Sequence, residues 1–318
     1  MARALESDLD RISVVTPTFN RPEPLARALA SLLAQRGFEE LEVELIVVDN
    51  SSDRNAKPAV AALAQDAPFP LHYVSEPRPG VANARNAGVA AATGRWIAFL
   101  DDDEEAAPDW LAALVRVARE TGADAVFGPI EAKAEGGGEI GAFAPYFERS
   151  VTRCDLADIT DLAAYLGTNN SMFDRLGCLG EEENFDLRLN ESGGEDSLLL
   201  QRLVLAGKIF RFAADAHVIE WAPRRRLNWS YVKKRKFASG QIRVFVQAMA
   251  RPGDPLAIAR WMAVGLAQSA IFGATTLLSM PLGEDRRERM AARLHAGLGK
   301  VFWAPRFRLA LYGRGHIS

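Results

Sequence analysis

Short strand-like runs alternate with helix-like stretches over the first 130 residues of the chain. The strand-like runs are rich in apolar and β-branched residues and cover residues 11–17, 43–49, 71–75, 95–101 and 124–130. Between them, apolar side chains recur at helical spacing, as they do after Pro22. Strands that alternate with helices pair in parallel, and their helices cover both faces of the sheet. The pattern therefore predicts an α/β fold with a mostly parallel sheet.

Three of the expected strands end in polar or turn-forming residues. The first ends in Thr16 and Pro17, the second in Asp49, and the fourth in the triplet Asp101–Asp103. Ligands bind α/β sheets at the carboxyl ends of the strands, so these residues are expected to meet at one edge. No GxGxxG motif follows the first strand, which argues against an ordinary dinucleotide site.

The aspartate triplet Asp101–Asp103 follows an apolar strand in the segment FLDDD. Hard cations such as Mg²⁺ or Mn²⁺ prefer carboxylate oxygens and keep positions for water and phosphate. A cation held here would neutralise a diphosphate leaving group. The alternative is a solvated helix N-terminus, where acidic residues are also favoured. The position at the expected ligand edge favours the metal or ligand site.

Other candidate residues each have a structural alternative. Asp49 can bind a ribose or a base, or it can close an Asx turn with the residues after it. Arg85 can hold a phosphate or a base carbonyl, or it can lie on a helix surface. Glu195 and Asp196 follow two glycines, so they can cap the next helix or supply a general base. Further on, residues 209–219 are expected to form one strand.

Several motifs in a fixed order resemble the inverting glycosyltransferases of family 2, which have a GT-A fold. They are TPTFNRP (16–22), VVDNSS (47–52), GVANARNAG (80–88), FLDDD (99–103) with DW (109–110), TNN (168–170) and GGEDSLL (193–199). The order and spacing match from residue 11 to about residue 245. The details are most similar to bacterial exopolysaccharide glucosyltransferases of the succinoglycan type.

The resemblance implies a role for each matching residue. Thr16 and Asp49 would contact the nucleotide base, Pro17 and Asn20 would shape its pocket, and Arg85 would bind the nucleotide. Asp101 would contact ribose or sugar, Asp102 would belong to the same nucleotide-sugar site, Asn170 would line the sugar site, and Asp103 would hold Mg²⁺ or Mn²⁺. Asp196 would be the catalytic base, and Glu195 would position the acceptor or the base.

The chain departs from the family pattern at one position. Relatives often carry a histidine directly before a glutamate, whereas here the pair is Ile219–Glu220. His217 lies two residues before Ile219, on the same face of an extended strand. We expect His217 either to substitute as a metal ligand or to be a structural histidine.

Charge divides the chain into an acidic and a basic part. Residues 221–318 carry a net charge of +14, whereas residues 1–220 carry −17. A basic part favours an anionic partner, either a membrane surface or a nucleic acid. Nucleic acid is disfavoured because the acidic body would repel phosphates.

Residues 261–283 contain no charge over 23 positions, which as a helix is about 34 Å long. Three interpretations stay open for this basic and aromatic C-terminal region. It can lie on anionic lipid, form a helical subdomain over the active site, or span the bilayer.

We therefore expect a GT-A domain over residues 1–225 and a basic, helical, membrane-associating region over residues 226–318. The implied reaction moves glucose from UDP-glucose to a glycan or a polyprenyl-diphosphate-linked saccharide. The expected location is cytoplasmic, at the inner face of the cell membrane. The alternatives are a catalytically inactive nucleotide-sugar-binding partner subunit and a phosphatase of the haloacid-dehalogenase type. That phosphatase family expects Thr or Val where this chain has Glu105.

Overall fold

A computed structural model describes residues 11–37, 41–279 and 283–309. Its main sheet has seven strands in the order β3-β2-β1-β4-β8-β6-β9. These are β1 (Arg11–Thr18), β2 (Glu42–Asp49), β3 (Leu71–Ser75), β4 (Trp96–Phe99), β6 (Ala125–Phe127), β8 (Ser171–Asp174) and β9 (Phe210–Phe212). Only β8 runs antiparallel to its neighbours β4 and β6 among the described strands of this sheet. The predicted α/β fold with a mostly parallel sheet is confirmed.

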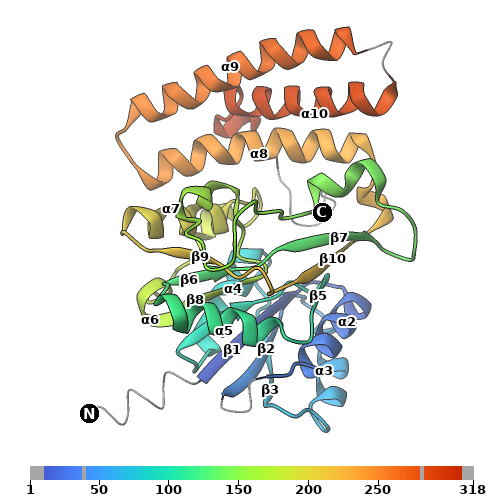
Figure 1. Ribbon diagram of the computed structural model, residues 1–318, viewed down its shortest axis with the longest axis vertical. Coiled ribbons are helices and arrows are strands. Elements are labelled where there is room, and N and C mark those ends of the chain that lie inside the picture. The colour runs from blue at the N-terminus through green and yellow to red at the C-terminus, as the bar shows by residue number, and fades with distance from the viewer. Residues whose placement is uncertain (1–10, 38–40, 280–282, 310–318) are drawn as a thin grey trace.

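Helices cover both faces of this sheet (Figure 1). One face packs against α2 (Pro22–Leu33), α3 (Lys57–Leu63) and α5 (Trp110–Thr121), and the other against α4 (Val81–Ala91) and α7 (Glu195–Leu205). Short helical segments connect them: α6 (Arg175–Cys178), η1 (Gly141–Tyr146), η2 (Thr160–Tyr165), η3 (Leu187–Leu189), η4 (Arg224–Arg226) and η6 (Pro305–Phe307).

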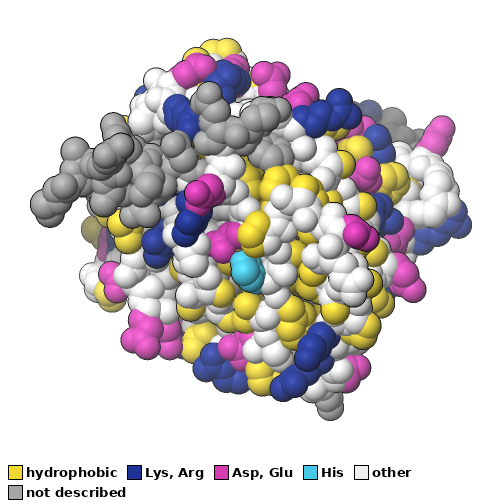
Figure 2. Space-filling model, turned by 90° about the horizontal axis from the view of Figure 1, so that it is seen from below, with side chains coloured by type: hydrophobic (Ala, Val, Ile, Leu, Met, Phe, Trp, Pro, Cys, Tyr) yellow, Lys and Arg dark blue, Asp and Glu magenta, His cyan; other side chains and the backbone are white. Residues whose placement is uncertain are grey.

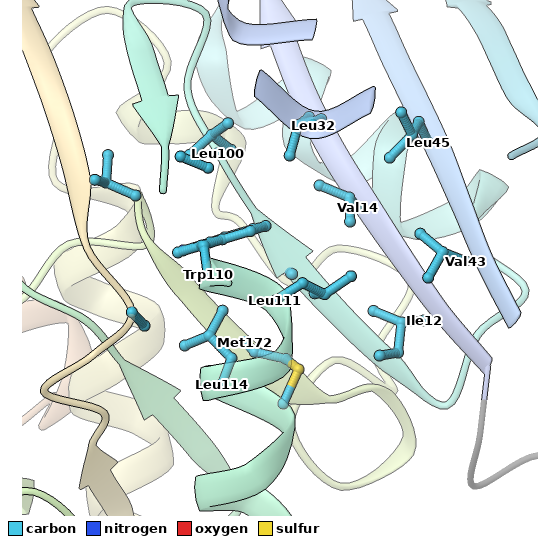
Figure 3. Close-up of a cluster of buried hydrophobic side chains, with 14 of the residues drawn as sticks. Ile12, Val14, Leu32, Val43, Leu45, Leu100, Trp110, Leu111, Leu114 and Met172 are labelled. Carbon is cyan, nitrogen blue, oxygen red and sulfur yellow. The ribbon is translucent and has the colours of Figure 1, made fainter. Parts of the chain in front are cut away.

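Successive side chains of each strand point to opposite faces of the sheet, so the core has two parts. Ile12 and Val14 on β1 point to the α2 and α5 side, where Figure 3 shows them beside Trp110 and Met172. Val15 points to the other face and packs towards α4. There Gly88 leaves the space that Val15 fills, since a Cβ on Gly88 would collide with the Val15 side chain. The side-chain period of two along a strand thus places adjacent residues in different layers.

A second, three-stranded sheet lies beside the edge of the first and has the order β5-β10-β7. Its strands are β5 (Glu104–Ala106), β7 (Ile130–Ala134) and β10 (Val218–Ala222). The prediction of a single strand over 209–219 is therefore wrong, because the chain leaves the main sheet after β9 and turns before β10. The expected strand over 124–130 is likewise divided. It breaks at Gly128, where any side chain would collide with Asn170 and the backbone of Ala216.

The C-terminal part forms a layer of three long helices at one end of the molecule (Figure 1). They are α8 (Trp229–Ala250), α9 (Pro255–Leu278) and α10 (Glu284–Val301). Helix α10 packs against both others, and α8 packs on α7. Within the described ranges α9 alone is long and apolar enough to cross a membrane, and 6% of its most apolar window is buried. At the opposite end of the molecule, acidic and basic side chains are interspersed among hydrophobic ones (Figure 2).

Paired glycines allow the three helices to approach closely. Gly240 on α8 faces Gly299 on α10, and Gly265 on α9 faces Gly297 on α10. A Cβ on Gly240 would collide with the carbonyl oxygen of Ala296. Glycine in a helix interior is intrinsically unfavourable, so its use here reflects backbone contact between the helices.

We predict opposite outcomes for two helical glycines replaced by alanine. Gly240→Ala should lower the free energy of unfolding by about 1–3 kcal/mol through overpacking. Gly273→Ala is the control, because its nearest neighbouring atom would lie 3.9 Å from the new Cβ. It should instead be neutral or stabilising by about 0.5–1 kcal/mol. Urea denaturation followed by circular dichroism measures both, and equal tolerance would contradict the close packing of α8 and α10.

Candidate active site

A cleft of about 1800 Å³ opens where the carboxyl ends of β1 and β4 meet the C-terminal helices. The sheet side contributes eight of the residues predicted from the sequence, namely Pro17, Asn20, Arg85, Asp101, Asp102, Asp103, Glu195 and Asp196. The opposite wall comes from α8, with Trp261 of α9 and Lys300 of α10. The expected meeting of these motifs at one edge of the sheet is therefore observed for most of them.

Arginines neutralise the aspartate triplet. The Asp102 carboxylate is buried and accepts hydrogen bonds from Thr18 Oγ1 and Arg21 Nη1, both at 2.8 Å. Arg21 Nη1 also donates to Asp103 at 2.9 Å, and Arg226 Nη1 lies 3.5 Å from the same carboxylate. Asp102 is therefore held by Thr18 and Arg21 at the wall of the cleft, and Asp103 stands between two guanidinium groups.

Arg85 connects the triplet to the start of α7. Its side chain is buried; Nη1 donates to Glu195 Oε1 at 2.5 Å and Nη2 to Asp101 Oδ1 at 3.3 Å. The loop before α7 also holds α4 in place, because Asn190 Oδ1 accepts hydrogen bonds from the first backbone amides of that helix. Only glycine fits at position 80, because φ is +127° there and a Cβ atom would collide with the Asn190 side chain.

Several buried carboxyl groups of this cleft have raised pKa values. Burial, then the neighbouring Asp196, raises the pKa of Glu195 to about 7. Burial, then Asp103, raises the pKa of both Asp102 and Glu220 to about 7. The charged forms of these carboxylates are thus costly in the free protein, and a bound cation would stabilise them.

Asp196 is placed differently from Glu195. It is partly exposed, lines the cleft, and its Oδ1 accepts a hydrogen bond from the backbone amide of Ser197 at 2.6 Å. In the described part of the chain its Oδ2 accepts no hydrogen bond. Asp196 thus combines a local helix-start contact with a free carboxylate oxygen at the cleft, which is what a general base requires.

Two expected base contacts do not line the cleft. The four acceptor positions of the Asp49 carboxylate are taken by Ser51 N, Ser51 Oγ, Ala56 N and Tyr73 Oη. The Asx-turn alternative therefore describes Asp49 in this structure. Thr16 is buried below the surface, and its Oγ1 has no hydrogen-bond partner in the described residues. Their neighbours Thr18 and Asn50 line the cleft in their place.

Asn170 is also turned away from the cleft. Its Oδ1 accepts from Trp110 Nε1 at 2.8 Å, and its Nδ2 donates to the carbonyl oxygens of Pro129 and Ala216. Asn170 lies directly before β8 and has φ +49°, in the left-handed region of the backbone. Asn169 lines the cleft instead and bonds Arg149 and Glu104. The TNN motif thus contributes its middle residue to the cleft rather than its last.

His217 does not approach Asp103. Its side chain is exposed just before β10 and does not line the cleft. Glu220, three residues further along, does line it and pairs across the sheet with Glu104. The expectation that His217 substitutes as a metal ligand finds no support in this geometry, because the turn before β10 directs it to solvent.

The residues present fit a divalent cation in their chemistry. In the described ranges no three His, Cys, Asp or Glu side chains converge as a metal cluster. Carboxylates of Asp101, Asp103 and Glu220 nevertheless line one cleft, and their mutual repulsion favours a positive charge there. Mg²⁺ is commonly held by one or two carboxylates together with substrate phosphates, so a preformed triad is not required.

Apart from Arg85, the cations of the cleft are not among the site residues predicted from the sequence. These cations include Arg21, Arg149, Arg226, Arg235, Lys236, Arg243 and Lys300. The run KKRK at 233–236 lies on α8, where Arg235 and Lys236 line the cleft, as in the interpretation of a helical subdomain over the active site. The contribution of α8 to the cleft depends on tertiary packing, which no local pattern indicates.

Comparison with known proteins gives the family. The sequence profile of Glycosyl transferase family 2 matches residues 13–168. The succinoglycan biosynthesis protein ExoM of Rhizobium meliloti (strain 1021) is 34% identical over 293 residues, which are 90% of this chain and 91% of the relative. The chain belongs to glycosyltransferase family 2. The predicted family and the predicted glycosyltransferase activity are both confirmed.

Solved structures of similar fold support the same assignment. The mannosyltransferase PcManGT from Pyrobaculum calidifontis, in complex with GDP-Man and Mn²⁺, has a TM-score of 0.59 at 22% identity, covering 92% of this chain and 87% of that one. TarS residues 1–349 from S. aureus, in complex with UDP, has a TM-score of 0.55 at 16% identity, covering 92% and 90%. This family 2 glycosyltransferase therefore has the predicted GT-A-like fold.

We predict that Asn170→Ala destabilises this glycosyltransferase by about 2–4 kcal/mol, because a buried indole N–H and two carbonyl groups lose their partners. Asn169→Ala is the comparison and should cost less stability, since Asn169 is partly exposed. Urea denaturation measures both. Normal stability of Asn170→Ala combined with lost nucleotide-sugar binding would restore the sugar-site role of Asn170.

Proposed function

We propose that this chain transfers a hexose, with inversion, from a nucleoside diphosphate sugar to a saccharide acceptor in exopolysaccharide assembly. The observation that carries this proposal is the single cleft that Asp101, Asp103 and Asp196 share, with Arg85 between the two acidic segments. The names of its relatives support the biological context, since two are succinoglycan biosynthesis proteins.

The donor is proposed to lie on the sheet side of the cleft, with Pro17 and Asn20 at its nucleotide. UDP-glucose is the proposed donor, because one relative is named as a β-1,3-glucosyltransferase and a structural neighbour binds UDP. Asp103 would hold Mg²⁺ or Mn²⁺, with Asp101 and Glu220 nearby, and that cation would neutralise the departing diphosphate. Arg21 and Arg226 contact the Asp103 carboxylate in this structure, and part of these contacts would have to break when the cation binds.

Asp196 is the proposed general base. Its carboxylate takes the proton of an acceptor hydroxyl as that oxygen attacks the anomeric carbon of the donor. The bond from this carbon to the diphosphate oxygen breaks on the opposite face, and the nucleoside diphosphate leaves with the bonding electrons. A transition state with oxocarbenium character is expected, as in glycoside hydrolysis. Glu195, held by Arg85, would position Asp196 and the acceptor.

The acceptor is proposed to be a glycan or a saccharide carried on a polyprenyl diphosphate. One relative is named for an acceptor linked to undecaprenol through a diphosphate. The C-terminal region 226–318 would hold the enzyme at the inner face of the cell membrane, in the cytoplasm. In support, α9 is the outermost helix and exposes large apolar side chains such as Leu256, Leu266 and Ile271.

Asp196→Asn tests the proposed chemistry. We expect the turnover number to fall by roughly 10²–10⁴-fold, because an amide cannot accept the hydroxyl proton. Binding of UDP should be unchanged, since Asp196 would contact the acceptor rather than the nucleotide. Asp215→Asn is the matched control, as Asp215 is an exposed aspartate that does not line the cleft.

Transfer is measured with radiolabelled UDP-glucose and a membrane extract that contains lipid-linked saccharides, and UDP binding by calorimetry. Joint loss of transfer and UDP binding in Asp196→Asn would contradict the base assignment. A wild-type chain that binds UDP but transfers no sugar would favour the inactive partner subunit.

A further inference from the structure

Three of the cations that line the cleft from the helical layer have no carboxylate partner in the described residues. They are Lys236 and Arg243 on α8 and Lys300 on α10. Among the residues that the structure describes, no carboxylate forms an ion pair with any of them. By contrast, Lys233 on the same helix is paired with Glu288 at 2.8 Å, outside the cleft. Lys236, Arg243 and Lys300 thus line the cavity without a carboxylate partner.

Aromatic rings and carbonyl groups surround these cations in place of acids. Lys236 lies over the ring of Tyr146, and Arg243 lies over Tyr165 at 4.6 Å and Trp261 at 5.7 Å. Lys300 donates to Gln268 Oε1 at 2.7 Å. Such contacts orient the charges without neutralising them, so their capacity to bind an anion is retained.

The charges repel one another. Burial, then Arg243 and Lys236, lowers the pKa of Lys300 to about 8. Burial and the arginines Arg235, Arg243 and Arg293 lower the pKa of Lys236. A cluster of partly buried cations without acidic partners destabilises the free protein, and a multivalent anion would relieve this repulsion.

The start of α7 separates this cluster from the aspartate triplet. On one side, Glu195 connects through Arg85 to Asp101. On the other side, Gly194 contacts Ile242, the neighbour of Arg243 in α8. Asp196 at the start of α7 thus lines the same cleft as the triplet on the sheet side, which is the acidic wall, and as these cations on α8 and α10, which are the basic wall. A group bound by the basic wall would be on the acceptor side of the proposed base.

We propose that Lys236, Arg243 and Lys300 bind the diphosphate that joins the acceptor saccharide to its lipid. This inference rests on the proposed function for its orientation, since it takes the acidic wall as the donor side. Helix α9 supports a lipid-linked source for the phosphates. It contributes Trp261 to the same cleft and exposes apolar side chains on the outer end of the molecule.

The test uses the full chain with its donor site filled by saturating UDP and Mn²⁺, and inorganic pyrophosphate as the probe in calorimetry. The variant is Lys236→Gln combined with Lys300→Gln, which should fold because it removes mutual repulsion. Lys234→Gln is the matched control, as Lys234 is exposed on the same helix and does not line the cleft. Pyrophosphate should bind wild type and control, and bind the double variant at least about tenfold more weakly. UDP affinity should be equal in all three.

Farnesyl diphosphate is the second probe and distinguishes a lipid diphosphate from a free one. It should bind wild type more tightly than pyrophosphate, because its chain would bury apolar surface along α9. Equal affinity for the two probes would overturn the lipid-linked source. Three results would overturn the proposed diphosphate site. They are the absence of pyrophosphate binding in the presence of UDP, equal pyrophosphate binding by wild type and double variant, and a fall in UDP affinity in the double variant. If wild type fails to bind UDP, the proposed function fails, and the comparison of pyrophosphate binding between wild type and variants still decides this site.

Discussion

The buried guanidinium of Arg85 is the contact on which the rest of the site depends. It reaches from α4 to Glu195 at the start of α7 and to Asp101 after β4. The buried carboxylate of Glu195 and the half-buried carboxylate of Asp101 would otherwise repel each other where water solvates them poorly. A shared arginine fixes both in space and leaves Asp196, the next residue, at the cleft with a free oxygen. The link between sheet edge and helix α7 thus orders the residues to which the chemistry is assigned.

The opposite charges of the two parts of the chain have a structural meaning. The acidic body, residues 1–220, supplies the carboxylates at the sheet edge, and the basic part supplies the facing wall through α8 and α10. The far end of the molecule has mixed charges without such a division (Figure 2). The triplet carboxylates and the cations of α8 and α10 line the same cleft, where a donor with a cation and an anionic acceptor would need different surroundings. The C-terminal helices form part of the active-site wall besides any contact with a membrane.

Much of this arrangement could be predicted from the sequence because it depends on local patterns. Apolar strands between helices gave the sheet, and the residues after β1 and β4 met at its edge as expected. The site predictions fail where a shift of one residue along the chain decides which side chain lines the cleft. Asn170 has a positive φ that turns its side chain inward and leaves Asn169 at the cleft. His217 points to solvent because the chain changes sheets between β9 and β10. Asp49 closes the Asx turn that the sequence offered as its structural alternative. The cations of α8 depend on packing between distant segments, which no spacing of residues reveals.

Calorimetric titration of the purified chain with UDP, with and without Mn²⁺, tests the central claim most directly. If Asp101, Asp103 and Arg85 form the donor site, Mn²⁺ should strengthen the binding of UDP. In Asp103→Asn, the affinity for UDP should no longer depend on Mn²⁺. Binding of GDP in place of UDP would keep the site and change the donor. A folded chain that binds neither nucleotide in the presence of Mn²⁺ would contradict the assignment of this cleft as a nucleotide-sugar site.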